Sequence, residues 1–298
     1  MHDRFDLPAD IICVTASNED GGEYLICGTE RVALYDTGMA YSAKQLVSNT
    51  ERALARLGRE TLDAILISHS HYDHVGALGY VLRRWPQATV YGAAKAKSVF
   101  ENKSAVNFMK KMSENACSLC GDSNVALYMD GMRIDVVARD GDRIDLGDKY
   151  IEVLETKGHT DCSLTYIVKP DNIMFSSEST GVYVNIGNNN PAILKSYAQT
   201  KASLQKCRQA RSAAIISPHY NGLVPANQVD CYFDVAEMYA DKVKDLICSL
   251  IQRGETDEEI YEAYEAFFWP LHGGMIKKAF TVNAKACIKS MRREFFSV

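Results

Sequence analysis

A short apolar segment, residues 62–67, constrains the fold most, because polar residues and then a helical pattern follow it directly. A run of this length with a single charged residue is typical of a strand buried on both faces, as in parallel sheets. Further strands are predicted at 11–15, 23–27, 32–36 and 88–91, and helices at 43–57, ended by Gly58, and at 74–84. Strands that alternate with helices predict an α/β layered core.

The pattern changes near residue 191. Before it we predict a turn at 20–22, a helix at 93–116 and strands at 133–137, 150–155, 163–168 and 173–175. After it we predict helices at 192–210, 227–252, 257–268 and 274–293, with a strand at 213–216. We therefore predict a domain over residues 1–225 and a helical annex over residues 226–298, packed on the active-site side, where such elements often form a pocket wall.

Composition excludes several classes of protein. The net charge of −5 argues against nucleic acid, whose phosphates need a clustered basic surface. No run approaches the roughly 20 apolar residues of a membrane span, and the start lacks the basic and apolar regions of a signal peptide. The nine cysteines are an odd number and scattered, so we expect reduced thiols and a cytoplasmic protein. Cys117 and Cys120 form a CxxC, but no second CxxC is present to complete a four-thiolate zinc site.

Metal-binding residue types concentrate directly after the segment at 62–67. His69 and His71 alternate with other residues, so in extended backbone both imidazoles point to the same side. Asp73 and His74 then fall on the turn into the next helix. Three histidines and a carboxylate this close together have no ordinary packing role, and zinc, iron and manganese all accept these ligands. The segment predicts a metal site at the end of a buried strand, where α/β sheets usually bind ligands.

The spacing of these four residues resembles the HxHxDH signature of the metallo-β-lactamase superfamily. His159 in the sequence GHT and His219 in the sequence PHY each follow a predicted strand and resemble the family's two remaining histidines. The Asp-Thr-Gly run that begins at Asp36 resembles the family's Asp-Thr/Ser-Gly, which supports the metal loop. The resemblance covers roughly residues 10–220 and implies an αββα two-sheet sandwich, with the metal site at one edge between the sheets.

One position departs from the family pattern. The family places a bridging aspartate after an apolar strand in a Phe-x-Gly-Asp context, whereas this chain has Phe175-Ser176-Ser177-Glu178. Glu178 keeps the carboxylate but adds a methylene, and Ser177 stands where the family has glycine. Three alternatives stay open: Glu178 bridges two metals, binds one metal, or is a surface acid after a strand.

The resemblance implies two divalent transition metal ions, zinc or iron, with manganese as a further candidate. It assigns His69, His71 and His159 to the first metal, and Asp73, His74 and His219 to the second, with Asp73 also given the catalytic role. Such a pair lowers the pKa of a shared water from about 15.7 towards 7, so that a metal-bound hydroxide attacks the substrate. The implied activity is that of a metal-dependent hydrolase acting on a small thioester or ester.

Segments outside the metal-binding motifs resemble one subgroup of the family. The helix after residue 93 and the annex resemble the subgroup of the quinolone-signal response protein PqsE of pseudomonads, which implies a thioesterase-like enzyme. The alternatives are a lactonase or phosphodiesterase with the same site, or a metal-binding regulatory protein that acts through a partner. We expect a small-molecule substrate and neither a nucleic acid nor a membrane partner, and the sequence leaves an oligomer open. The weaker candidates, each at least as typical of a structural role, are Ser70, Tyr72, Cys162, Tyr220 and His272.

Overall fold

The computed structural model describes residues 7–16, 22–120, 125–129, 131–220, 222–271 and 276–296. The chain divides into two compact units, and each is described by itself. Unit 1 consists of Met1–Leu154 and Tyr166–Asp171, and unit 2 of Glu155–Thr165 and Asn172–Val298. The predicted domain of residues 1–225 and annex of residues 226–298 stay predictions.

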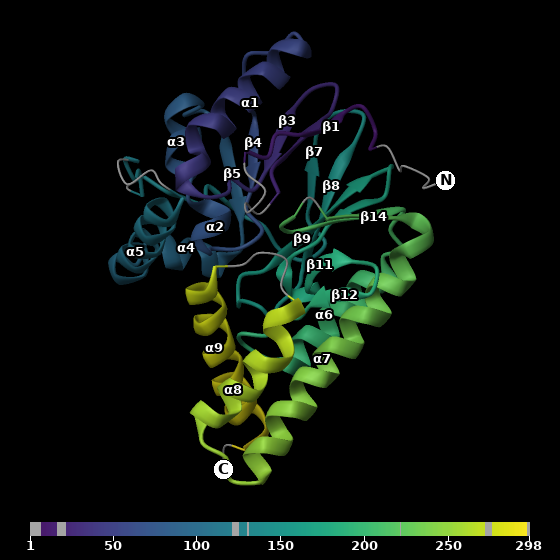
Figure 1. The fold of residues 1–298 in the computed structure, drawn as a ribbon. Helices are drawn as coiled ribbons and strands as arrows, with labels where there is room; N and C mark the ends of the chain where they lie inside the picture. The colour runs from purple at the N-terminus through teal and green to yellow at the C-terminus, as the bar shows by residue number, and fades with distance from the viewer. Residues whose placement is uncertain are drawn as a thin grey trace. The chain divides into compact units, whose positions relative to one another are not determined.

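The first sheet of unit 1 has six strands in the order β1-β2-β3-β4-β5-β6, of which Figure 1 labels β1, β3, β4 and β5. The first three pair antiparallel, and β3 to β6 pair in parallel. Every residue of β4 is buried, as the apolar segment predicts. The strands are β1 (Ile11–Cys13), β2 (Tyr24–Cys27), β3 (Val32–Tyr35), β4 (Ala64–Leu66), β5 (Thr89–Gly92) and β6 (Val136–Val137).

Helices accompany this sheet, and α1 and α3 lie beside it in Figure 1. The helix predicted at 74–84 is divided, because Val75 forms a β-bridge with Gly38. The helix predicted at 93–116 is also two helices, because the side chain of Asn102 accepts the Ser104 N–H at 2.9 Å and starts a new helix. The bounds are η1 (Ala40–Ser42), α1 (Ala43–Arg56), α2 (Tyr72–Val75), α3 (Leu78–Arg84), α4 (Ala94–Phe100) and α5 (Lys103–Leu119).

A second layer of strands faces the first sheet within unit 1. Its strands are β7 (Arg143–Asp145), β8 (Tyr150–Glu155) and β9 (Leu164–Lys169). Tyr166 of β9 reaches across to the first sheet, where its hydroxyl donates to the Ile67 carbonyl at 2.9 Å. Its ring packs edge-on against Tyr35, with ring centroids 6.1 Å apart. Unit 1 therefore contains two facing sheet layers.

Unit 2 begins with strands and ends in helices. Strand β10 pairs in parallel with β13, which pairs antiparallel with β14, and β11 and β12 form a separate antiparallel pair. The helix predicted at 192–210 starts later, because the Ser196 side chain caps it by accepting the Gln199 N–H. The bounds are β10 (Ile173–Phe175), η2 (Glu178–Thr180), β11 (Val182–Asn185), β12 (Asn188–Asn190), α6 (Tyr197–Gln209), β13 (Ala214–Ser217) and β14 (Gly222–Pro225).

The last part of unit 2 is a group of helices, in which α8 and α9 pack against the long α7 (Figure 1). Apolar residues including Val243, Ile260 and Phe280 form its buried core. A capping box, in which Thr256 and Glu259 exchange hydrogen bonds, starts α8 at the predicted residue. The bounds are η3 (Ala226–Gln228), α7 (Val229–Gln252), α8 (Asp257–Phe268), η4 (Trp269–Leu271) and α9 (Lys277–Phe296).

Four strands of the described residues were not predicted from the sequence: β7, β11, β12 and β14. Each has three or four residues, and β12 consists of three asparagines, which are depleted in strands. Residues 20–21 of the predicted turn lie outside the described residues. None of the helices in the described residues is long and apolar enough to cross a membrane.

Candidate metal centre

The histidine-rich segment of unit 1 runs from the end of β4 into α2. His69 and His74 are fully buried, with ring centroids 4.1 Å apart. The His71 ring lies 4.6 Å from that of His69, in agreement with side chains that point to one side of the segment. Because α2 begins at Tyr72, Asp73 and His74 leave from its first turn. Unit 1 thus groups four candidate ligands at the end of a buried strand.

Asp36 orients two of these histidines. Its carboxylate accepts the Ser68 N–H at 2.8 Å and the Ser68 hydroxyl at 2.6 Å, and lies 2.8 Å from Nδ1 of His74. The Nδ1 of His74 therefore carries the proton, which leaves the lone pair on Nε2 for a metal. Because the Ser68 hydroxyl donates to Asp36, it accepts from the Nδ1 of His69, 3.1 Å away. Both histidines therefore keep the Nε2 lone pair available.

The residues after Asp36 hold the metal loop through its main chain. The Thr37 N–H and hydroxyl both donate to the His74 carbonyl, at 2.9 and 3.1 Å. Gly76 is packed so closely that a Cβ there would lie 2.5 Å from the Tyr72 carbonyl oxygen and 2.7 Å from the Ala40 nitrogen. The Asp-Thr-Gly run therefore supports the loop, as its sequence resemblance implies.

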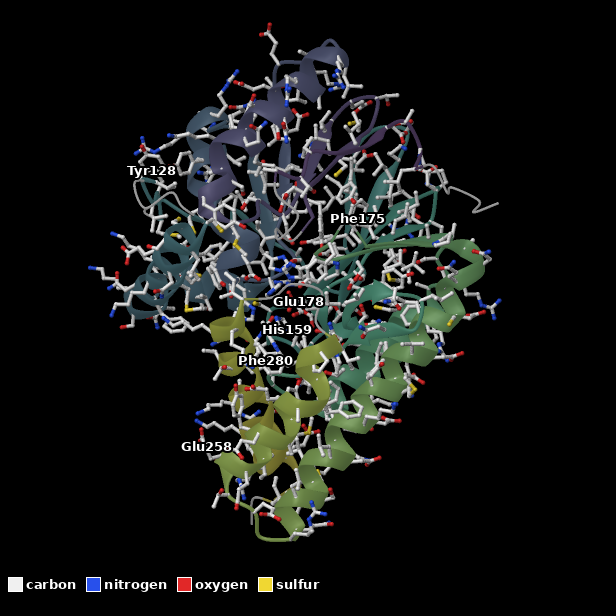
Figure 2. All side chains as sticks on the ribbon, viewed as in Figure 1. Tyr128, His159, Phe175, Glu178, Glu258 and Phe280 are labelled. Atoms are coloured by element: carbon white, nitrogen blue, oxygen red, sulfur yellow. The ribbon has the colours of Figure 1, made fainter. Side chains whose placement is uncertain are left out.

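His159 is the first candidate ligand of unit 2. It follows Gly158, whose φ of +136° favours glycine. The His159 N–H donates to the Ser179 hydroxyl at 3.1 Å, and its Nδ1 lies 2.8 Å from the Ala192 carbonyl oxygen. A carbonyl can only accept, so Nδ1 carries the proton and Nε2 presents its lone pair. That Nε2 lies 2.8 Å from Oε2 of Glu178, and Figure 2 shows the two residues next to each other.

The buried carboxylate of Glu178 stands between two histidines. His219 follows β13 in a left-handed backbone conformation, φ +64°, which non-glycine residues adopt mainly where the surroundings enforce it. Its Nε2 lies 2.6 Å from Oε1 of Glu178, whereas His159 faces the other oxygen. Glu178 is therefore not a surface acid, because only 6% of it is exposed.

The donor set of unit 2 fits a divalent metal. The Nε2 lone pair of His159 and a carboxylate oxygen both carry negative potential, so at 2.8 Å they repel unless a proton or a metal cation is shared between them. Imidazole nitrogen and carboxylate oxygen are the ligands that zinc, iron and manganese accept. Candidate metal-ligating groups thus occur in both units.

The backbone before Glu178 does not require the glycine that the family has at position 177. Ser177 has φ −88° and ψ 165°, which is extended backbone open to any residue. Its N–H donates to the Thr165 hydroxyl at 3.1 Å, and its own hydroxyl lies 2.9 Å from that of Thr156. Glu178 is reached without a left-handed residue, so the substitution of glycine is compatible with this backbone.

Sequence reasoning missed the groups that hold Glu178 and His159. Hydroxyl residues flank Glu178 on both sides, and Tyr232 of α7 places its hydroxyl 2.8 Å from that of Thr180. Burial raises the pKa of the Tyr232 phenol. The hydroxyl-rich sequence SSEST at 176–180 was the available signal. The role of the Ala192 carbonyl could not be predicted from the sequence, because every residue has a main-chain carbonyl.

Four of the five weaker candidates lie in the described part of the chain. Ser70 and Cys162 are buried, and the Cys162 thiol lies 3.3 Å from the Thr160 hydroxyl. Tyr72 and Tyr220 are half-buried, and His272 lies outside the described residues. All nine cysteines lie in the described part of the chain, and no disulfide bond joins any two of them there.

Comparison with known families agrees with this geometry. The family model described as the metallo-β-lactamase superfamily matches residues 24–219, about two thirds of the chain. The chain belongs to this superfamily. Its members are generally metal-dependent hydrolases, and the candidate ligands His69, His71, Asp73, His74, His159, Glu178 and His219 all lie within the matched range.

Curated relatives match only in part. A coenzyme F420H2 oxidase of Methanothermobacter marburgensis is 30% identical over 54% of this chain and 34% of that protein. The metallo-β-lactamase fold-containing protein ST1585 of Sulfurisphaera tokodaii is 28% identical over 54% of this chain and 58% of that protein. A hydroxyacylglutathione hydrolase of Hahella chejuensis is 33% identical over 36% of this chain and 28% of that protein. The chain therefore spans between 28% and 58% of the length of these relatives.

Solved structures share the fold. A metallo-β-lactamase family protein of Thermus thermophilus superposes with a TM-score of 0.66 at 16% identity, covering 96% of this chain and 92% of that one. The archaeal protein ST1585 gives a TM-score of 0.55, covering 95% and 96%. The predicted αββα two-sheet fold with helices at its C-terminal end is confirmed.

Proposed function

We propose that the seven candidate ligands form one centre for two divalent metals and that this centre hydrolyses a small thioester or ester. The first metal would be held by His69, His71 and His159, and the second by Asp73, His74 and His219. Glu178 would contribute to both. The proposal rests on family membership and on the tautomers that each unit imposes on its own histidines.

One observation carries this proposal: each carboxylate oxygen of Glu178 faces the Nε2 of a different histidine, at 2.6 and 2.8 Å. Because the Nε2 of His159 carries a lone pair, its contact with a carboxylate oxygen needs a shared proton or a cation. Two cations would satisfy both contacts, one at each oxygen. The negative charge of Glu178 is therefore shared between its two oxygens, one facing His159 and one facing His219, which suits a pair of nearby metal ions.

The residues of the chain would prepare the site before any substrate binds. When bound, the metals would supply Lewis acidity that brings the pKa of water from about 15.7 towards 7. Asp36 and the Ala192 carbonyl keep protons on Nδ1, so two ligand nitrogens face the centre without reorganisation. Asp73, on the first turn of α2, would add a carboxylate to the second metal and share in orienting the attacking water.

The support for the substrate class comes from relatives rather than from geometry. Hydroxyacylglutathione hydrolases, by name, cleave an acylated glutathione, which supports an ester-like carbonyl substrate here. The PqsE-like subgroup and an annex on the active-site side belong to the same proposal, as do a cytoplasmic location and a small-molecule partner. The match to a coenzyme F420H2 oxidase covers only 34% of that protein and adds no argument for an oxidase.

The direct test combines metal counting with hydrolysis. Metal-free protein is loaded with Zn²⁺, Mn²⁺ or, without oxygen, Fe²⁺, and bound metal is counted by elemental analysis. Hydrolysis of an acyl-glutathione thioester, a simple lactone and a phosphodiester is then compared. We expect two equivalents of metal and fastest turnover of the thioester. His69→Ala and His159→Ala should each cut bound metal to about half or less, whereas His2→Ala, outside the motif, should not.

Two outcomes would replace the proposal. Stoichiometric metal with no hydrolysis of any of the three substrates would favour the metal-binding regulatory protein. Preferred turnover of the lactone or the phosphodiester would keep the centre and change the substrate class. Unchanged metal content in both histidine variants would refute the centre itself.

A further inference from the structure

Tyr232 connects helix α7 to the segment that carries Glu178. It is almost completely buried, with 1% of its surface exposed. Its hydroxyl lies 2.8 Å from the Thr180 hydroxyl, 3.2 Å from the Thr180 carbonyl oxygen and 3.5 Å from the Ser176 hydroxyl. Ser176 and Thr180 lie on the two sides of Glu178, two residues away in each direction.

The Thr180 hydroxyl fixes the direction of these hydrogen bonds. The Thr180 hydroxyl donates to the Ser177 carbonyl at 3.0 Å, and the Thr180 N–H donates to the same oxygen at 3.0 Å. Its proton is therefore committed, so the Tyr232 phenol is the donor, and its proton is shared between the Thr180 hydroxyl at 2.8 Å and the Thr180 carbonyl at 3.2 Å. A chain of two hydrogen bonds runs from Tyr232 through Thr180 to Ser177. This chain closes the turn that contains Glu178.

The turn needs such support because it is short. Helix η2 has three residues, and isolated 3₁₀ turns have poor hydrogen-bond geometry. Thr180 is also held from the other side, where the Asn189 side chain donates to its carbonyl at 3.2 Å. Gly181, with φ +85°, then ends the turn. Without an anchor at Thr180, the carboxylate of Glu178 would be free to rotate away from one histidine.

The phenol suits this role because it stays a donor. Burial raises the pKa of Tyr232, so its proton is retained across the pH range in which carboxylates and imidazoles are ligands. A buried donor that faces only oxygen acceptors has a defined orientation. Tyr232 is separated from Glu178 by Thr180 and does not itself reach the carboxylate in any contact above.

We propose that Tyr232 is a positioning residue for Glu178, which keeps its two carboxylate oxygens aimed at His159 and His219. The inference rests on the proposed function, because it assigns metal binding to Glu178. It makes metal affinity depend on a residue of α7, outside every ligand-bearing segment. The loss should be larger for the second metal, because without Glu178 the first metal would keep three imidazole ligands and the second only two.

The test uses Tyr232→Phe, which removes only the hydroxyl. Zn²⁺ affinity is measured for each equivalent by competition with a chelator, and the Co²⁺-loaded protein is examined by visible absorption, which reports ligand geometry. We expect the second equivalent to bind about 10- to 100-fold more weakly and the cobalt spectrum to change. Tyr197→Phe is the matched control, because it removes a hydroxyl that donates to Asp241 at 2.6 Å in the same unit. The control should leave both readouts unchanged.

A second pair of variants separates positioning from folding. Thr180→Val removes the relay hydroxyl with little change of shape, and Thr180→Ser restores it. We expect Val to reproduce the Tyr232→Phe loss and Ser to bind both metals as the wild type does. The melting temperature of the metal-free protein reports folding independently of metal.

The outcomes are distinct. If Tyr232→Phe and Thr180→Val bind both equivalents with wild-type affinity and an unchanged cobalt spectrum, Tyr232 has no positioning role. If the wild type binds metal but hydrolyses no substrate, while Tyr232→Phe still weakens the second metal, the proposed hydrolase activity fails and the positioning role stands.

Discussion

The carboxylate of Asp36 lies 2.8 Å from Nδ1 of His74, and both side chains are completely buried. The two residues are 38 positions apart in sequence, and the backbone of Asp36 is left-handed, with φ +48°. Strained backbone conformations of this kind cluster at functional sites, where the surrounding structure enforces them. Here the carboxylate of Asp36 fixes the tautomer of His74, and through Ser68 that of His69.

Asp36→Asn tests this relationship with little change of shape, since asparagine also tolerates left-handed backbone. The amide is a weaker acceptor than the carboxylate, so His74 loses its fixed tautomer and part of its basicity. We expect metal affinity to fall about 10- to 100-fold, mainly for the second metal. Zn²⁺ competition titration measures it. The matched control is Asp63→Asn, which alters a carboxylate that accepts the Val32 N–H at 2.8 Å. Equal effects of both variants on metal affinity would argue against the tautomer role.

Gly76→Ala should be strongly destabilising, because the new Cβ would lie 2.5 and 2.7 Å from backbone atoms of Tyr72 and Ala40. Backbone cannot move aside as a flexible side chain does, so we expect a loss of about 1–3 kcal/mol, as for overpacked cores. Urea unfolding of the metal-free protein gives the value. Gly187→Ala, where the nearest atom is 3.7 Å away, should change stability little. A wild-type unfolding midpoint for Gly76→Ala would show that the loop has more room than the structure gives it.

Tyr166→Phe tests the contact between the two sheet layers of unit 1. It removes the hydroxyl that donates to the Ile67 carbonyl at 2.9 Å and leaves that buried oxygen without this donor. We expect a loss of about 1–2 kcal/mol in the free energy of unfolding, measured in urea. Tyr80→Phe removes a hydroxyl that donates to the Ala126 carbonyl at an exposed position, where water can replace it. The prediction is wrong if the two variants lose the same amount.

The sequence was most informative where chemistry and local pattern coincide. The buried strand before His69, and the family to which the spacing of His69 to His74 belongs, were both predictable because they depend on neighbours in sequence. The start of α8 was predictable for the same reason, since its capping box is a local arrangement.

Tertiary contacts were not predictable. The break between α2 and α3 arises because Val75 pairs with Gly38, which is far away in sequence. Strand β12 forms from asparagines that local propensity disfavours, and it is held by pairing with β11. The tautomer of His159 is set by a main-chain carbonyl, and the turn at Glu178 by a phenol 54 residues later, so neither leaves a local pattern.

Glu178 is the position where this chain and the family differ. Each of its oxygens faces a different histidine, so the neutral amide of Glu178→Gln would keep one oxygen and replace the other with an N–H donor. An N–H cannot bind a cation, and the negative charge shared by the two positions is lost. We expect Glu178→Gln to weaken the second metal about 10- to 100-fold, and more than the first.

The matched variant is Glu178→Asp, which keeps the charge and installs the residue that the family uses. We expect it to bind two equivalents of metal, because the charge shared between the two positions is what holds both ions close together. Titration of both variants with Zn²⁺ and with Fe²⁺ compares the two equivalents directly. If Glu178→Gln binds two equivalents as tightly as the wild type, Glu178 is not a ligand, and its contacts with His159 and His219 are ordinary hydrogen bonds between protonated imidazoles and a carboxylate.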